Sequence, residues 1–216
     1  MKVAVIDYGA GNLVSIEQAL TRVGAEVVIA RDPRVLDDVG ALVVPGVGAA
    51  GPAMRRLRRF GLLDPIRSWL ADDRPYLGIC LGLQVLFDGS DEDGATTLGV
   101  IGGRTTALED APTLPHIGWN QVDRRREHPL FAGIADGADF YFVHSYAGSP
   151  QDRSVTLATT THGRPFVSAV ARGRTFGVQF HPERSGQDGL RLLSNFVSIA
   201  RAVASGGPVE RLEVAV

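Results

Sequence analysis

The 216-residue sequence is poor in several residue types, and each shortage excludes a class of protein. It has one cysteine, which excludes an internal disulfide and makes a reducing cytoplasm the expected location. No apolar run approaches the roughly 20 residues of a membrane-spanning helix, so we expect no membrane anchor. Lys2 is the only lysine, and the net charge of −2 lacks the basic excess of a nucleic-acid-binding domain. The five scattered histidines have no metal-ligand spacing, so we predict neither a metal site nor another cofactor.

Apolar side chains are plentiful, at 44% of all residues, which is enough for a substantial core. The length fits one large domain, and no internal repeat or low-complexity linker divides the chain. We therefore expect residues 1–204 to form one domain and residues 205–216 to be a C-terminal tail. The arginine runs at 55–59 and 124–126 are interpreted as solvent-exposed faces.

The first eighty residues alternate short apolar runs with helical patterns, which is typical of the βα units of a parallel sheet. Because the chain passes from Lys2 directly into the first apolar run, it does not begin like a secretory signal. Apolar residues recur every three or four positions from Leu13 to Val23 and predict an amphipathic helix. The expected buried strands are residues 3–6, 25–30, 41–44 and 75–79.

From about residue 95 the pattern changes to short strand candidates separated by Gly, Pro and Asp, which we interpret as antiparallel. A final helix is predicted from Leu190 to Ala200. The predicted fold class is α/β: one domain with a central, mostly parallel sheet flanked by helices, plus antiparallel extension strands in the C-terminal half. These candidate strands are residues 98–101, 119–123, 140–146, 155–160, 167–171 and 175–180.

The single cysteine, Cys80, lies between a predicted strand and a predicted helix, with Gly78 and Gly82 two positions away on either side. This G-x-C-x-G spacing has the form of a nucleophile elbow, in which the glycines permit a tight turn. At the start of a helix, the thiol also meets the positive end of the macrodipole and unpaired N–H groups, which favour the thiolate. A lone cysteine is usually a small buried hydrophobe, so this interpretation requires a base elsewhere in the chain.

A candidate base is His181, which ends an apolar run and is followed by Pro182 and Glu183. Because Pro182 fixes φ and turns the chain, Glu183 can fold back towards the imidazole. A carboxylate in that position would hold the tautomer that accepts the thiol proton. The order Cys80, His181, Glu183 predicts a nucleophile, a base and a group that orients the base.

A third element is the glycine-rich stretch that follows the third strand and contains Val47 and Gly48. Loops at the carboxyl ends of parallel strands share one edge of the sheet, so this loop and Cys80 can face the same crevice. Its free N–H groups could complete an oxyanion hole. The alternative is a flexible connection without a catalytic role.

Together these segments resemble class I glutamine amidotransferases, whose paired signature matches G-I-C-L-G-L-Q at 78–84 and H-P-E at 181–183. Within that class, the chain is similar over about residues 2–202 to the glutaminase subunit of imidazole glycerol phosphate synthase, of histidine biosynthesis. The segments that carry this similarity are D-Y-G-A-G-N at 7–12, P-G-V-G at 45–48, P-H-I-G-W-N at 115–120 and F-V-H-S-Y at 142–146.

The resemblance implies hydrolysis of L-glutamine to glutamate and ammonia. Cys80 would attack the side-chain amide carbon, and N–H groups of Leu81 and of the loop at Val47 and Gly48 would bind the oxyanion. His181 would protonate the leaving ammonia and later activate water, while Glu183 orients it. The residues expected to contact glutamine are Gly48, Gln84, Glu92, Ser145 and Tyr146.

The resemblance also implies a heterodimer with a cyclase subunit that has a (β/α)₈ barrel. The cyclase would use the ammonia to make imidazole glycerol phosphate and an aminoimidazole carboxamide nucleotide. A barrel of this kind takes about 250 residues, so this chain has no room for one. The residues expected to face the partner are Asn12, His116, Trp119 and Asn120.

Three alternatives are considered at this point. The nearest is an amidotransferase subunit for anthranilate, purine, guanylate or pyridoxal phosphate synthesis. A nicotinamide-binding domain is suggested by Gly9-x-Gly11 after the first strand and Asp32 after the second, but Val14 stands where the fingerprint needs a third glycine. A catalytically inactive interaction module is disfavoured because all three triad residues are present.

Overall fold

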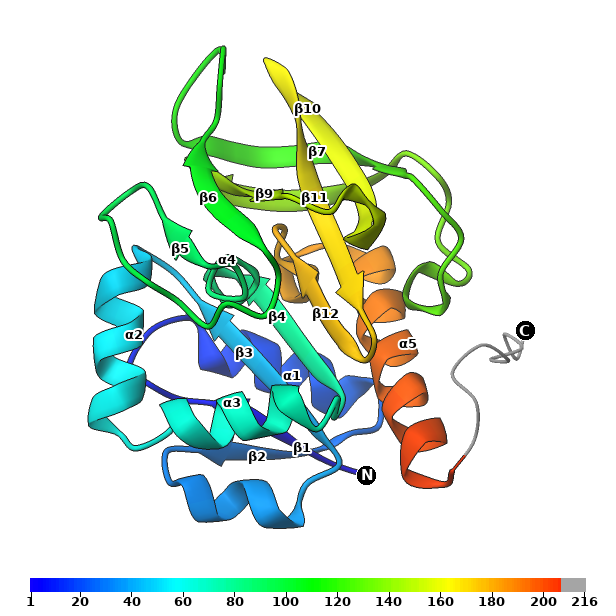
Figure 1. Cartoon of the computed structure of the whole chain (residues 1–216). Helices are drawn as coiled ribbons and strands as arrows, with labels where there is room; N and C mark the ends of the chain where they lie inside the picture. Colours follow the sequence, from blue (N-terminus) through cyan, green and yellow to red (C-terminus); the bar gives the residue numbers. More distant parts are fainter. Residues whose placement is uncertain (207–216) are drawn as a thin grey trace.

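The structure, a computed structural model, describes residues 1–206 and contains one long sheet with helices on both faces (Figure 1). The strands of this sheet are β1 (Lys2–Ile6), β2 (Glu26–Ala30), β3 (Ala41–Gly46), β4 (Tyr76–Cys80), β7 (His116–Arg124), β8 (Ala138–His144), β10 (Thr156–His162), β11 (Arg164–Arg172) and β12 (Thr175–Val178). Their order is β2-β1-β3-β4-β12-β11-β10-β7-β8. The first five in this order are mutually parallel and the rest pair antiparallel, which confirms the predicted fold class.

Helices cover both faces of the parallel half of the sheet. On one face, α1 (Leu13–Arg22) and α5 (Gly186–Ala204) pack in a core that includes Ile16, Leu20 and Phe196. On the other face, α2 (Ala50–Arg59) and α3 (Leu63–Ala71) pack against the opposite side chains of the same strands. The periodic apolar positions of α1 and α5 are therefore buried or partly buried against the core.

A second, three-stranded sheet of β5 (Gly89–Ser90), β6 (Gly103–Ala107) and β9 (Tyr146–Pro150) lies beside the antiparallel half. The expected strand at residues 98–101 is wrong, because the structure has no strand there. Its N–H groups instead bond to the carbonyls of Val85, Leu86 and Phe87, which close the turn after the elbow. The run at 140–146 is also not one strand, since it is divided at Ser145 between β8 and β9.

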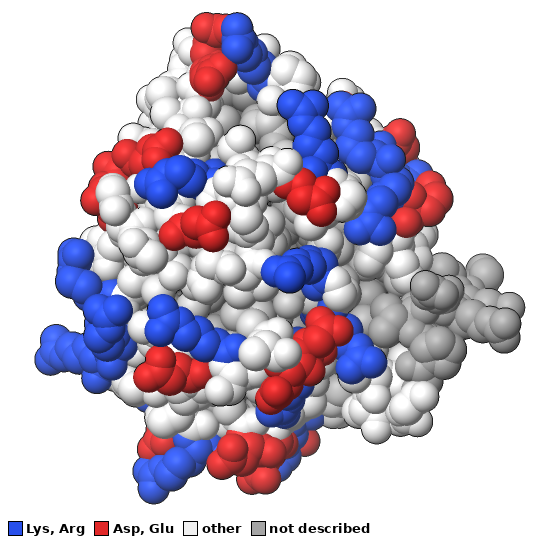
Figure 2. Space-filling view, in the orientation of Figure 1, with Lys and Arg blue, Asp and Glu red and all other residues white. Residues whose placement is uncertain are grey.

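Charged side chains are distributed over the surface without one dominant sign. Basic and acidic groups alternate on the face in Figure 2, and the arginines of α2 lie on its exposed side as predicted. Within residues 1–206, no helix is both long and apolar enough to cross a bilayer. The same residues contain no cluster of three or more side chains that could hold a metal ion. Ser205 and Gly206 form a turn after α5, and the rest of the expected tail, residues 207–216, lies outside the described residues.

Candidate active site

Cys80 ends β4 in a strained turn at the carboxyl edge of the parallel strands. Its φ is 54°, a left-handed conformation that costs a non-glycine residue energy and is common at functional sites. The flanking glycines are needed for close approach of the backbone. A Cβ on Gly78 would lie 2.2 Å from the carbonyl oxygen of Gly82, and one on Gly82 would lie 1.8 Å from that of Val44. The G-x-C-x-G spacing therefore forms the tight elbow expected from the sequence.

The helix after the elbow is shorter than the sequence suggested. It is the single turn α4 (Leu81–Gln84), and Val85 already caps its end. A macrodipole of one turn is small, so the positive helix end contributes less to the thiolate than we expected. Direct contacts to the Cys80 sulfur have a larger effect on it than this short helix. Gln179 donates its Nε2–H to Cys80 Sγ at 3.5 Å, and the carbonyl oxygen of Val143 lies 3.9 Å from the same sulfur.

His181 follows β12, the strand that pairs with β4, so the base lies beside the nucleophile although about 100 residues separate them. Its backbone N–H bonds to the carbonyl oxygen of Tyr141 on β8, and its carbonyl accepts from the Ser185 hydroxyl at 2.7 Å. The short 3₁₀ turn η4 (Pro182–Arg184) then brings the Glu183 carboxylate to 2.8 Å from His181 Nδ1. The predicted fold-back of the acid after Pro182 is present in the structure.

The electrostatics of this pair favour imidazolium. Burial by itself disfavours the charged ring, but the nearby Cys80 and Glu183 outweigh it and raise the pKa of His181 to about 10. Both His181 and Glu183 have side chains less than a tenth exposed, so solvent screens them little. His181 Nε2 makes no hydrogen bond of normal geometry with any described residue, although Cys80 is close enough to affect its proton affinity.

The glycine-rich loop begins beside the nucleophile, because Gly46 at the end of β3 is in register with Cys80. A Cβ on Gly46 would lie 2.0 Å from the Tyr8 hydroxyl, so this position is held tightly. Val47 and Gly48 are exposed, and Gly48 has a φ of 88° with open space around it. Conformational freedom in the loop is therefore concentrated at Gly48, whereas Gly46 is fixed in the sheet. Leu81, whose N–H was expected to face the oxyanion, directly follows Cys80 at the start of α4.

Two expected glutamine contacts lie together next to Cys80. Gln84 is buried, and its Nε2 donates to the carbonyl oxygen of Tyr146 at 2.8 Å and to Gln179 Oε1 at 3.1 Å. Ser145 lies between β8 and β9, directly before Tyr146. Gln179 was not among the residues predicted from the sequence, although it contacts Cys80 and is fully buried. A signal was available, because Gln179 is a polar residue inside the apolar run at 175–180.

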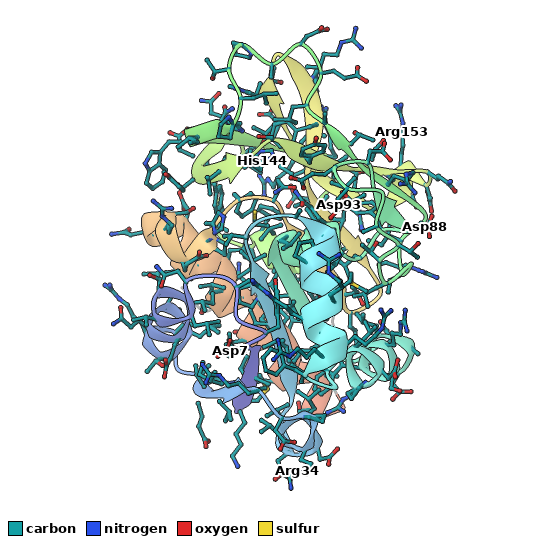
Figure 3. All side chains as sticks on the ribbon, turned by 90° about the vertical axis from the view of Figure 1, so that its left-hand side faces the viewer. Asp7, Arg34, Asp88, Asp93, His144 and Arg153 are labelled. Carbon is teal, nitrogen blue, oxygen red and sulfur yellow. The ribbon has the colours of Figure 1, made fainter. Side chains whose placement is uncertain are left out.

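Glu92 lies on the loop after β5 and is exposed, with no hydrogen bond or ion pair from its carboxylate among residues 1–206. Partial desolvation of its carboxyl group and the neighbouring Asp93 raise the pKa of Glu92 above its ordinary value. The loop is attached to α2, since Asp93 accepts the Gly51 N–H at 2.7 Å, and Figure 3 labels Asp93 near the end of that helix. The structure thus places Glu92 over the start of α2 but does not join it to the triad.

The expected partner-facing residues are in different environments. Trp119 is 56% exposed, and Asn12 is exposed but already caps α1 through Ser15. His116, which was expected to face the partner, is buried in the chain. Its Nε2 lies 3.1 Å from the half-buried Asn120 amide nitrogen, and its Nδ1 lies 3.0 Å from His144 Nε2.

The tautomers of these histidines follow from their partners. His144, labelled in Figure 3, must donate from Nδ1 to the Tyr146 carbonyl oxygen, which can only accept. Its Nε2 therefore accepts from His116, whose own Nε2 accepts from Asn120. Burial lowers the pKa of His116 to about 4 and that of His144 to about 3, so both rings are neutral at pH 7.

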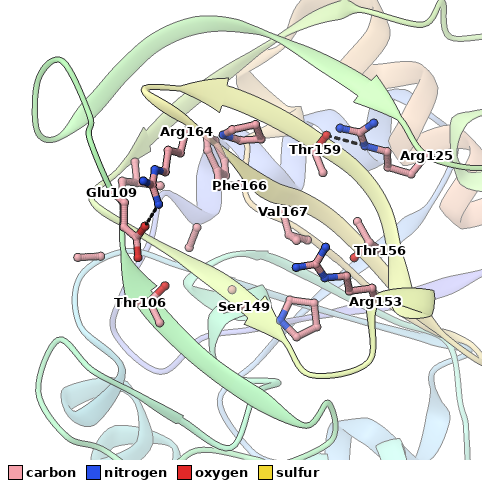
Figure 4. Close-up of a pocket in the computed structure, with 16 residues that line it drawn as sticks. Thr106, Glu109, Arg125, Ser149, Arg153, Thr156, Thr159, Arg164, Phe166 and Val167 are labelled. Carbon is pink, nitrogen blue, oxygen red and sulfur yellow. Dashed lines mark hydrogen bonds and ion pairs between the residues drawn. The ribbon is translucent and has the colours of Figure 1, made fainter.

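A cavity of about 720 Å³ lies between the small sheet and β10 and β11, away from the triad. Figure 4 shows its arginines, of which Arg125 bonds to Thr159 and Arg164 pairs with Glu109. None of the triad residues lines it, and neither do the expected glutamine contacts. We therefore locate the candidate active site at the elbow, where strain, burial and a perturbed pKa coincide.

Comparisons with known proteins identify the family of this chain. Residues 4–200 match the family model described as Glutamine amidotransferase class-I. The imidazole glycerol phosphate synthase subunit HisH of Dehalococcoides mccartyi is 46% identical over 92% of this chain and 97% of that protein. The HisH subunit of Chloroflexus aurantiacus is 46% identical over 95% of this chain and 99% of that protein.

Solved structures share the fold at lower identity. A putative GMP synthase protein from Thermoplasma acidophilum has a TM-score of 0.71 at 21% identity, covering 95% of this chain and 96% of that one. The structure of PurLQS from Thermotoga maritima gives a TM-score of 0.72 at 18% identity, covering 91% and 97%. These two likenesses support the fold, and the HisH relatives exclude the nicotinamide-binding alternative. The chain therefore belongs to the class I glutamine amidotransferase family, in the branch formed by the HisH subunits of imidazole glycerol phosphate synthase.

Proposed function

We propose that this chain hydrolyses L-glutamine to glutamate and ammonia, with Cys80 as nucleophile, His181 as acid and base, and Glu183 as the group that orients His181. One observation carries the proposal: a strained elbow cysteine lies beside a buried His–Glu pair joined at 2.8 Å, in a chain of the amidotransferase family. This is the arrangement of a nucleophile, a base and an orienting group.

The steps follow from the chemistry of these groups. Cys80 Sγ bonds to the amide carbon, and N–H groups of Leu81 and of the loop at Gly48 stabilise the oxyanion. The C–N bond breaks as His181 gives its proton to the leaving ammonia, which leaves a γ-glutamyl thioester. His181 then takes a proton from water, the water oxygen attacks the thioester carbon, and the C–S bond breaks to release glutamate.

Glutamine recognition is assigned to residues around the elbow. We propose that Gly48, Gln84, Glu92, Ser145 and Tyr146 contact the α-amino and carboxylate groups of the substrate. The burial of Gln84 beside Tyr146 supports this placement for two of them. The amidotransferase domain is taken as residues 1–204, which ends with α5.

We further propose that the ammonia passes to a cyclase subunit in a cytoplasmic heterodimer. Apolar side chains are exposed on two segments next to the site. Ile117 and Trp119 lie on β7, which pairs with the strand that carries Val143, and Val47 lies on the glycine-rich loop; each is about half exposed or more. The rings of Trp119 and Tyr141 meet edge to face, and the Arg184 guanidinium lies over the Tyr141 ring, 3.9 Å from its centroid. Aromatic and arginine side chains of this kind are enriched in protein interfaces.

The test of the catalytic proposal uses the Cys80→Ala variant in the complex with the cyclase. Glutamine-dependent glutamate release should disappear, whereas synthesis from free ammonia should continue because the acceptor site is intact. The unmodified complex and the exposed variant Gln151→Glu are the controls. Glutamine hydrolysis by Cys80→Ala at the wild-type rate would exclude this mechanism.

The partner proposal needs a separate measurement. The chain should co-purify with a histidine-pathway cyclase, and the cyclase with its nucleotide should increase glutamate release. Trp119→Ala should weaken the complex by about 2 kcal/mol or more, roughly 30-fold in Kd, if Trp119 is a central contact. Stimulation by a purine, guanylate or anthranilate synthase instead would assign the chain to another pathway.

A further inference from the structure

Gln179 lies next to the nucleophile and has no role in the mechanism above. It follows β12, whose Val178 is in register with Ile79 of β4, so Gln179 and Cys80 are side by side at the ends of neighbouring strands. Its side chain is completely buried. A buried amide must satisfy both its donor and its acceptor, and here the donor Nε2 faces Cys80 Sγ at 3.5 Å.

The orientation of this amide is fixed by one backbone carbonyl. The oxygen of Tyr146 can only accept, so the Gln84 side chain must present its Nε2 to it, at 2.8 Å. The second N–H of Gln84 then points to Gln179 at 3.1 Å, and the atom of Gln179 that receives it must be Oε1. If Gln179 were flipped, two NH₂ groups would face each other. Gln179 therefore presents N–H, and not oxygen, to the sulfur.

We propose that Gln179 is a positioning residue that donates a hydrogen bond to the Cys80 thiolate, with its donor aimed by Gln84 and the Tyr146 carbonyl. The proposal rests on Cys80 being the nucleophile. A charged sulfur accepts a hydrogen bond more strongly than a neutral thiol, so this donor favours the thiolate. The Val143 carbonyl, 3.9 Å from the sulfur, can only accept and favours the protonated thiol. Gln179 acts against that tendency and fixes the direction of the sulfur lone pairs.

The chain has a single cysteine, so alkylation by iodoacetamide reports on Cys80 alone. The sharpest variant is Gln179→Glu, which keeps an oxygen for Gln84 but replaces the donor to sulfur with a second oxygen. Gln179→Met removes the donor without adding charge. A hydrogen bond to a charged group changes an ionisation equilibrium, here that between thiol and thiolate, by about tenfold. We expect the midpoint pH of alkylation to rise by about 1 unit in Gln179→Met and by more in Gln179→Glu.

Steady-state kinetics of glutamine hydrolysis distinguish a positioning role of Gln179 from a role in stabilising the fold. Both variants should lower kcat for glutamine hydrolysis about tenfold or more with little change in KM, while ammonia-dependent synthesis in the complex is kept. Gln151→Glu, an exposed change of the same type in the turn after β9, should alter neither the alkylation midpoint nor kcat. In the unmodified chain, the side-chain NH₂ resonances of Gln179 should titrate with the alkylation midpoint, a readout that does not depend on any variant folding.

Unchanged alkylation midpoints in folded Gln179→Glu and Gln179→Met, or NH₂ resonances that do not follow Cys80, would overturn the proposal. That failure differs from failure of the proposed function. If Cys80→Ala abolishes hydrolysis while the Gln179 variants behave as the unmodified chain, the nucleophile stands and only the positioning role is lost. If Cys80→Ala still hydrolyses glutamine, the catalytic proposal itself is wrong.

Discussion

Replacing the Glu183 carboxylate by an amide, Glu183→Gln, tests the electrostatics of the site most directly. Glu183 Oε1 lies 2.8 Å from His181 Nδ1, and both side chains are nearly buried, so their attraction is poorly screened. Unit charges about 4 Å apart at an effective dielectric constant near 20 attract by about 4 kcal/mol. At about 1.4 kcal/mol per pH unit, losing this charge lowers the pKa of His181 by roughly 3 units, from about 10 to near 7.

The tautomer is affected as well. A glutamine at 183 can present either its oxygen or its NH₂ group to Nδ1, and the second choice moves the proton of His181 to Nε2, where a base is needed. In catalytic triads, the change from carboxylate to amide costs up to about 10⁴ in rate. We expect glutamine kcat/KM to fall at least 100-fold and the acid limb of its pH profile to shift.

The assay is glutamate release over pH 5–10, with the complex and nucleotide present and with melting temperature as the check on folding. Glu17→Gln, which removes an exposed carboxylate from α1, is the matched control and should leave the profile unchanged. A Glu183→Gln variant that keeps more than a tenth of the activity with the original pH profile would refute the electrostatic reasoning.

Two predictions concern stability. His128 Nδ1 accepts the Leu130 N–H at 3.1 Å, and burial together with Arg126 lowers the pKa of His128 to about 4. Between pH 6.5 and 4 the unfolded chain therefore binds more protons at His128 than the folded chain does. The contribution of this group to the free energy of unfolding is complete above pH 6.5 and is lost as the pH falls towards 4. His128→Asn keeps a capping oxygen but does not titrate in this range. Between pH 8 and pH 5, its free energy of unfolding in denaturant should fall by about 1 kcal/mol less than that of the unmodified chain, after allowance for the partly exposed ring. The same fall in both proteins would contradict this. Gly82→Ala places a Cβ 1.8 Å from the Val44 carbonyl oxygen and should lower the free energy of unfolding by about 3 kcal/mol. Gly61→Ala, where the added Cβ meets open space, should lower it by about 1 kcal/mol in the same denaturant experiment. Equal losses in the two variants would show that the contact with Val44 does not matter.

The parallel half of the fold and the arrangement of Cys80, His181 and Glu183 could be predicted because their signals are local. Each βα unit carries its own apolar run and turn residues, and the elbow and the His-Pro-Glu turn lie within a few residues of their functional side chains. The fold-back of Glu183 followed from the fixed φ of Pro182, and the 2.8 Å contact is present. These features depend on short-range geometry, which a sequence records directly.

The elements that could not be predicted depend on tertiary contacts. Residues 98–101 resemble a strand because they are apolar, but their N–H groups are used by carbonyls of residues 85–87. The helix after Cys80 is one turn because those same carbonyls find partners outside the helix. His116 was expected to face the partner, and its burial could not be foreseen because β8 supplies the His144 and Phe142 that cover it. In each case the deciding partner lies 10 or more positions away in the sequence.

The topology explains why the chemistry collects at one point. Strand β12 enters the sheet between β4 and β11, so Cys80 at the end of β4 meets Gln179 and His181, which follow β12. The chain that leaves β8 and enters β9 lies against this edge, and it supplies the Val143 and Tyr146 carbonyls that contact the sulfur and Gln84. The parallel strands alone would place Cys80 and His181 together but would not orient the side-chain amides of Gln84 and Gln179. The antiparallel extension therefore serves the active site directly, since the break at Ser145 positions the one carbonyl that aims both glutamine side chains.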